Sequence, residues 1–333
     1  MVARRTEPER RRDRRRRLVK GLLGGLAVGG AAVGIPALIN ALVARRSKPL
    51  APARWGRGYH YAWRGGDVAF QRLGAGPAAV LLHSFGPGAS GEEWREVAET
   101  LAADHEIFVP DLLGWGRSDK PRRTYDGELY LRLLVDFLVD VVARPATLVA
   151  AGLPAGYAML TAVDHPEIVD ALALLTPLGL DLASEEPDLM DALAQRALRL
   201  PILGTTALNA YTSRAALTRW LRNEVFAAPE RADAALVDML HRAAHQPGGR
   251  YALTAWLCGY LNVDVEPALT RSRQRLWLGW GRAAVTPAVE SADRWLRHRP
   301  DAELEVFEAC GSLPHLEAPR RVAASLARFL TPR

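Results

Sequence analysis

The chain has 333 residues, about half of them apolar, which is enough for one large domain with a substantial buried core. Its formal net charge is +6, but residues 1–20 alone hold ten Lys and Arg against three acidic residues. The rest of the chain therefore carries a net charge of −1. Because a nucleic-acid-binding domain needs a basic folded surface, this distribution argues against a nucleic-acid partner.

Residues 21–43 form an apolar run without a charged side chain, long enough to cross a hydrocarbon core of about 30 Å. Ten positive residues precede the run, and Arg45, Arg46 and Lys48 follow it. This asymmetry favours a cytoplasmic N-terminus, with the main domain outside the cytoplasm. We expect an uncleaved single-pass anchor, with the membrane as a partner. A twin-arginine export signal and a cleaved signal peptide are the alternatives.

After a Pro- and Arg-rich linker at 44–58, short apolar runs alternate with stretches of helical spacing. This alternation predicts an α/β fold with a mostly parallel, eight-stranded-type sheet flanked by helices. The expected strands are 59–63, 68–73, 78–83, 106–110, 147–151, 171–175, 275–280 and 303–308. The expected helices of this core are 92–103, 129–142, 154–164, 287–298 and 319–330.

Between residues 180 and 261 the strand pattern disappears, and helical pieces at 189–198, 215–226 and 232–244 replace it. We interpret this segment as a helical cap lying over the sheet. The predicted organisation is therefore a basic tail at 1–20, the membrane helix at 21–43, the linker at 44–58, a core made of 59–179 and 262–333, and the cap at 180–261.

The two cysteines, Cys258 and Cys310, are far apart and outside any metal-binding spacing. We expect two buried thiols, with a disulfide as the alternative if the domain lies outside the cytoplasm. We expect neither a metal nor a cofactor.

Five motifs follow one another in a characteristic order. They are LLHSFGPG at 81–88, DLLGWGRSDKP at 111–121, a strand-turn-helix elbow AAGLP at 150–154, WGRAAVTP at 280–287 and CGSLPHLEAP at 310–319. In this order they resemble the capped α/β-hydrolase superfamily over the whole of residues 59–333. The resemblance implies an oxyanion loop at 83–88, a nucleophile in the elbow, an acid in the fourth motif and a catalytic His in the fifth.

Two of the three implied catalytic positions are degenerate. The family needs a nucleophile, an acid and a base in that chain order, but Gly152 and Ala284 occupy the first two positions. Only the base position is filled, by His315. Glycine suits the strained backbone of an elbow, because φ > 0 is costly for residues with a Cβ.

We therefore take His315 as the principal candidate for catalysis, with an inherited, merely hydrogen-bonded His as the alternative. Asp181 is a candidate replacement acid, although it also suits a helix N-cap. Ser84 is a candidate surrogate nucleophile, although its hydroxyl more readily lines the oxyanion region. The predicted oxyanion and pocket residues are His83, Ser84, Phe85, Gly86 and Leu153.

Two functions stay open on the sequence. The first is a membrane-anchored hydrolase of small, apolar, ester-like substrates, relying on His315 with a water, Ser84 or a substrate group as nucleophile. The second is a catalytically inactive pseudoenzyme that binds an apolar ligand or a protein partner.

Overall fold

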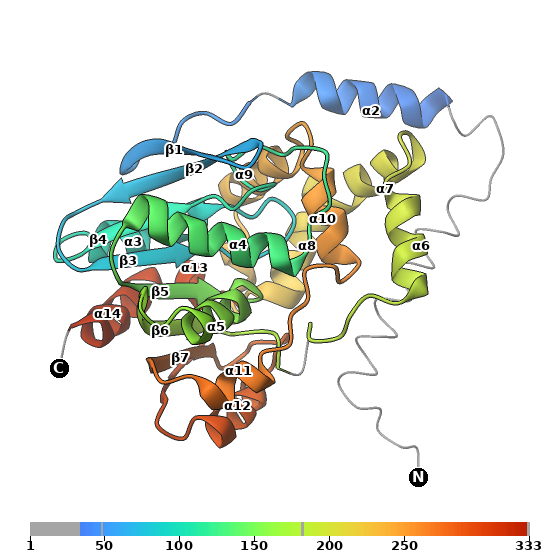
Figure 1. Cartoon of the computed structure of the whole chain (residues 1–333). Helices are drawn as coiled ribbons and strands as arrows, with labels where there is room; N and C mark the ends of the chain where they lie inside the picture. Colours follow the sequence, from blue (N-terminus) through green and yellow to red (C-terminus); the bar gives the residue numbers. More distant parts are fainter. Residues whose placement is uncertain (1–33, 48, 181–182, 332–333) are drawn as a thin grey trace, which may run out of the picture.

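The computed structural model describes residues 34–47, 49–180 and 183–331. Its centre is one eight-stranded sheet with the strand order β1-β2-β4-β3-β5-β6-β7-β8 (Figure 1). The strands are β1 Arg57–Trp63, β2 Gly66–Leu73, β3 Ala78–Leu82, β4 Glu106–Pro110, β5 Ala146–Ala151, β6 Val169–Leu175, β7 Arg275–Gly281 and β8 Glu303–Phe307. Each predicted strand is present.

The sheet is parallel from β4 to β8, and β2 runs antiparallel to both of its neighbours, β1 and β4. In β3, Ala78, Val80 and Leu82 face one hydrophobic cluster, whereas Ala79 and Leu81 face another. This strand is buried on both faces because helices cover both sides of the sheet. Parallel strands present their carboxyl ends at one edge, so the loops after β3, β4, β5 and β7 meet there.

The core helices form two layers, one on each face of the sheet. The bounds are α3 Arg95–Leu101, α4 Gly127–Phe137, α5 Pro154–Asp164, α11 Glu266–Arg271, α12 Ala292–His298, α13 Pro314–Glu317 and α14 Pro319–Leu330. α4, α5, α11 and α12 contribute buried side chains to the cluster on one face, and α3 and α14 contribute to the cluster on the other.

The predicted cap is helical. Its helices are α6 Leu189–Leu198, α7 Leu203–Tyr211, α8 Arg214–Trp220, α9 Ala234–Ala244 and α10 Arg250–Leu257. Buried residues around α8 and α9 form a small cluster of their own, and Leu313 and Leu316 of the His315 loop pack against it. The cap therefore touches the core directly beside the predicted catalytic histidine.

Helix α2, Gly34–Arg46, covers the second half of the predicted membrane span and packs on the cap. Its Asn40 amide donates to the Ile202 carbonyl at 2.9 Å and accepts from Asn209 at 2.9 Å, so α2 is docked on α7 (Figure 1). Within the described ranges, no helix is both long and apolar enough to cross a membrane. The first part of the predicted span, residues 21–33, lies outside the described residues. The transmembrane helix predicted at 21–43 is therefore not supported, because its second half packs on the cap.

The loop after β4 is held by Asp111. Its carboxylate accepts the backbone N–H of Gly91 at 2.6 Å and that of Arg117 at 2.6 Å. Gly91 begins a short 3-10 helix, η2 Gly91–Trp94, so Asp111 fixes the point at which the chain enters this turn. The prediction of two buried thiols is confirmed, since Cys258 and Cys310 are buried and are not joined by a disulfide.

Replacing Asp111 by Ala should destabilise the protein by about 2–4 kcal/mol, because the buried N–H of Gly91 and the half-buried N–H of Arg117 lose their acceptor. The measurement is urea unfolding followed by circular dichroism. Asp170→Ala, which removes an exposed carboxylate from β6, is the matched control and should change little. Equal stability of the two variants would contradict the role assigned to Asp111.

Candidate active site

The elbow between β5 and α5 has the geometry of a nucleophile turn without a nucleophile. Gly152 has φ +65°, a conformation that side chains rarely adopt, and its N–H donates to the Leu175 carbonyl at 3.0 Å. A Cβ built on Gly152 would meet only the Cβ of Ser84, at 3.8 Å. The backbone conformation therefore favours glycine, while the surrounding space would accept a small side chain.

His315 lies in the first turn of α13, and its side chain is 1% exposed. Its ring stacks on the indole of Trp94, with centroids 4.1 Å apart. Its Nε2 lies 3.1 Å from Oε1 of Glu93. The predicted base is thus held on one face by an aromatic ring and at one nitrogen by a carboxylate.

Glu93 is the polar centre of this site, and the sequence patterns did not single it out. Its Oε1 also accepts the backbone N–H of Ser84 at 2.6 Å, and its Oε2 accepts the Ser84 hydroxyl at 2.9 Å. Burial raises the pKa of Glu93, but the hydrogen bond and charge of His315, with the hydrogen bond from the Ser84 N–H, outweigh it and leave the pKa below its ordinary value. Glu93 is therefore an ionised carboxylate.

The hydrogen-bond direction at His315 follows from that ionisation. A carboxylate can only accept, so Nε2 of His315 must carry the hydrogen that joins it to Glu93. In a Ser-His-Asp triad, Nε2 is the nitrogen that takes the nucleophile's proton, and Nδ1 is the one that meets the acid. Here the carboxylate binds the nitrogen that would have to receive the proton. Among the described residues, none hydrogen-bonds Nδ1.

The acid side of the predicted triad offers no carboxylate at its family position. Ala284 is buried after β7, and its N–H donates to the Gly281 carbonyl at 3.1 Å. Asp181, the candidate replacement acid, lies outside the described residues. Its proposed pairing with His315 therefore stays a prediction.

His83 serves the loop rather than the reacting centre. The backbone N–H of Leu112 donates to its Nε2 at 3.0 Å, so Nδ1 carries the hydrogen and donates to the Ser84 carbonyl at 2.7 Å. The ring thereby ties the loop after β3 to the loop after β4, and it holds Ser84 where its N–H and hydroxyl reach Glu93.

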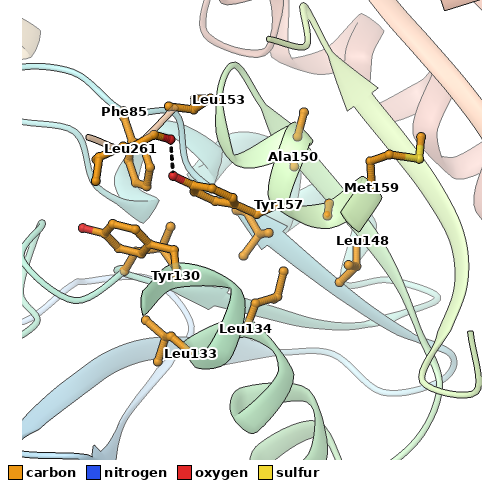
Figure 2. Packing of buried hydrophobic residues seen from close by; sticks show 14 of the residues in the cluster. Phe85, Tyr130, Leu133, Leu134, Leu148, Ala150, Leu153, Tyr157, Met159 and Leu261 are labelled. Atoms are coloured by element: carbon orange, nitrogen blue, oxygen red, sulfur yellow. Dashed lines mark hydrogen bonds between the residues drawn. The ribbon is translucent and has the colours of Figure 1, made fainter. Parts of the chain in front are cut away.

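Phe85 and Leu153 lie together over a floor of aromatic rings. Phe85 stacks on Trp115 at 5.1 Å and tilts onto Tyr130 at 4.9 Å, and Figure 2 shows Leu153 beside it at the start of α5. In the same view Tyr157 donates its hydroxyl to the Leu261 carbonyl, at 2.5 Å. This packing fixes the predicted oxyanion loop against the elbow.

Two other groups near the elbow in sequence are not available as nucleophiles. Burial raises the pKa of Tyr157 well above its ordinary value. Burial, with a contribution from Glu317, raises the pKa of Cys310 to about 11, so its thiol is protonated at neutral pH. In the described part of the chain, no three His, Cys, Asp or Glu side chains gather as metal ligands.

A hollow opens beside this cluster, between the oxyanion loop and the cap. Its volume is about 370 Å³ including open solvent, but the centre of a water molecule has only about 20 Å³ to move in, which is room for about one ordered water. Ser84, Gly86 and Glu93 contribute to it from the core, and apolar cap residues form its walls. Of the predicted pocket residues, Ser84 and Gly86 line it; His83, Phe85, Leu153 and His315 are buried beyond its lining.

A family model described as the alpha/beta hydrolase family matches residues 79–325, more than half of the chain. The chain belongs to this family. The five sequence motifs predicted this membership, and the loops that carry those motifs meet at one edge of the sheet.

The relatives of this chain include an uncharacterised protein and a protein named as a hydrolase. An uncharacterised protein of Mycobacterium tuberculosis is 28% identical over 274 residues, covering 79% of this chain and 77% of that protein. A 2-hydroxy-6-oxo-6-phenylhexa-2,4-dienoate hydrolase of Burkholderia cepacia is 26% identical over 246 residues, covering 72% and 82%.

Two solved structures illustrate the shared fold. A serine hydrolase involved in carbazole degradation superposes with a TM-score of 0.68 at 21% identity, covering 83% of this chain and 99% of that one. A bacterial membrane phospholipase A superposes with a TM-score of 0.66 at 23% identity, covering 95% and 98%.

The structure brings Gly152, Ser84, Glu93 and His315 into one cluster. Ser84 links its two halves, because its Cβ faces the empty side-chain position of Gly152 and its hydroxyl binds Glu93. Sequence reasoning missed Glu93 because an acidic residue at the start of a helix is ordinary. Only the fold shows that this carboxylate reaches a histidine 222 residues away.

Glu93→Gln should make stability less dependent on pH. Because the folded pKa of Glu93 is lowered, its ionised form contributes stability above the ordinary pKa of 4.5, and that contribution is lost as the pH falls through the lowered value. Wild type should therefore exceed Glu93→Gln at neutral pH, on the order of 1–3 kcal/mol, and the difference should shrink below pH 4.5. Urea unfolding across this range measures it.

Glu96→Gln is the control, since it changes an exposed carboxylate on α3 close to Glu93. Its pH profile should follow that of wild type. A Glu93→Gln profile parallel to wild type throughout would show that Glu93 is not the charged hub described above.

Proposed function

We propose that this member of the alpha/beta hydrolase family binds a small apolar ligand without hydrolysing it. The observation that carries the proposal is the hydrogen bond from Nε2 of His315 to the Glu93 carboxylate. That contact engages the nitrogen that a hydrolytic cycle would need free, while Gly152 supplies no nucleophile.

Ser84 is a poor substitute nucleophile in this arrangement. Its hydroxyl points to Glu93 and not to His315, so Glu93 would have to take its proton. A carboxylate whose pKa lies below its ordinary value is a weak general base at neutral pH. A water in the hollow would also be a poor nucleophile, because the base nearest to it is again Glu93.

The second candidate function is hydrolysis of a small organic substrate. It is favoured by the relatives, which include hydrolases of 2-hydroxy-6-oxohexadienoate-type compounds. It would require His315 to release Glu93 when substrate binds, so the two functions differ in whether that hydrogen bond survives ligand binding.

Rebuilding the missing groups tests whether Glu93 blocks His315. Wild type and the double variant Gly152→Ser, Ala284→Asp should give no turnover of short-chain 4-nitrophenyl esters above background, because Nε2 of His315 stays bound to Glu93. Adding Glu93→Ala should free Nε2 and the Ser84 N–H. Turnover should then rise on the order of 10²-fold over the double variant, the scale of a working general base.

His315→Ala, added to the triple variant, is the control and should abolish the gain. Wild-type turnover of ester, epoxide or lactone panels that is lost in His315→Ala would sink the binding proposal. Robust esterase activity in the double variant would show instead that Glu93 does not hold His315 out of catalysis.

We also propose that the N-terminal segment attaches the protein to a membrane. The support is the sequence itself: an Arg-rich tail, attracted to anionic lipids, followed by the uncharged run at 21–33. Placement of the folded domain outside the cytoplasm stays a prediction.

Membrane attachment predicts that the full chain sediments with membranes at low ionic strength, whereas a chain lacking residues 1–33 stays in the supernatant. A reporter fused after Arg333 reads the side on which the domain lies. Recovery of the full chain in the soluble fraction would refute attachment.

A further inference from the structure

The hollow above Ser84 and Glu93 has a floor that accepts hydrogen bonds and walls that are apolar. We propose that it selects ligands with a hydrogen-bond-donating head on an unbranched apolar chain, and rejects the carboxylates that ester hydrolysis would produce. This inference rests on the proposed binding function and specifies the ligand class of the same site.

The acceptor character of the floor follows from counting lone pairs. A carboxylate offers about four acceptor positions. In Glu93, Oε1 receives the Ser84 N–H and the His315 Nε2–H, whereas Oε2 receives only the Ser84 hydroxyl. One position on Oε2 is left for a ligand donor, and the Ser84 oxygen, having given its hydrogen to Glu93, can only accept from the hollow.

Exclusion of anions follows from the ionisation of Glu93. Its lowered pKa keeps the carboxylate charged at neutral pH, and its side chain is almost entirely buried. A second carboxylate entering the hollow would lie close to this charge with little water between them, which is unfavourable. The Ser84 N–H, a backbone donor beside this carboxylate, is already bound to Glu93 and cannot compensate.

The size and walls of the hollow define the rest of the ligand. The hollow has room for about one water, so a single small head group reaches the floor and the apolar chain lies in the mouth. The mouth is walled by apolar cap and loop side chains: Trp220, Leu221, Leu236, Met239, Leu240 and Leu316. Gly86 lets the Trp220 ring approach the loop, because a Cβ on Gly86 would lie 3.3 Å from that ring. A narrow chain suits this passage better than a branched or bulky one.

The test compares octanol, octylammonium and octanoate, which share one tail and differ in the head. Binding to the full chain in one fixed detergent is measured by calorimetry and by thermal stabilisation. Octanol or octylammonium should bind at least about tenfold more tightly than octanoate. A neutral floor would favour octanol and a net negative floor octylammonium; both results support a donor head.

Glu93→Gln is the informative variant, because it keeps the shape of the side chain but removes the charge and introduces an N–H donor. Glu93→Gln should bind octanoate at least about tenfold more tightly than wild type does. The preference for octanol and octylammonium over octanoate should therefore shrink or reverse. Comparing variants in the same detergent cancels partition of each probe into the micelles. Glu96→Gln, an exposed change on α3, should bind the three probes in the same order of affinity as wild type.

Leu236→Trp, which fills the mouth, should weaken the binding of all three probes together. This variant locates binding in the hollow even if Glu93→Gln folds poorly. Octanoate binding as tightly as octanol to wild type, an unchanged order in folded Glu93→Gln, or no binding of any probe would overturn the inference. None of these results involves turnover, so the absence of hydrolysis is tested separately by the rebuilt triad.

Discussion

A buried, ionised carboxylate needs donors, and the site of this protein is arranged around those of Glu93. Removing such a group from water costs several kcal/mol unless hydrogen bonds replace its hydration. Ser84 supplies its N–H and its hydroxyl, and His315 supplies Nε2–H. These donors come from two loops, so the position of one carboxylate on η2 couples the loop after β3 to the loop after β8. Asp111 sets η2 at its first residue, and the stacking of Trp94 on His315 closes the arrangement.

This arrangement keeps one electrostatic relationship of the family and loses another. A triad pairs an imidazole with a carboxylate at Nδ1 and leaves Nε2 for the nucleophile. Here Ala284 takes the acid position, and the carboxylate of Glu93 approaches from the opposite side, at Nε2. The histidine still has an anionic partner, but that partner occupies the nitrogen on which proton transfer depends. With Gly152 at the elbow, the strained φ of +65° no longer carries a side chain, so the turn keeps its shape without the steric cost.

The sequence predicted the sheet well because its strands are short, apolar and bounded by turns. Helix 154–164 and helix 189–198 were also predicted at their observed ends, the first by Pro154 at its start. Helices α7, α10 and α11 were missed, since their apolar spacing is irregular and their ends depend on packing against neighbours. The docking of α2 was missed for a different reason. A long uncharged run is typical of a membrane-spanning helix, and only the hydrogen bonds of Asn40 to α7 show that this helix packs on the cap. The role of Glu93 had no local signature, because its partners come from residues 84 and 315.

The same long-range coupling limits how a ligand can enter. Glu317, two residues after His315, accepts the N–H groups of Ala227, Ala228 and Gly311, so the loop of the histidine is bonded to the cap near its middle. Leu313 and Leu316 add apolar contact with the cluster formed by α8 and α9. Lifting this part of the cap would break a buried carboxylate network and expose that cluster at once. Adjustment of single side chains at the mouth, such as Trp220 and Leu236, is less costly. On the proposed binding function, a ligand that enters between α8 and α9 would leave the Glu93–His315 hydrogen bond undisturbed, which is the condition that separates binding from hydrolysis.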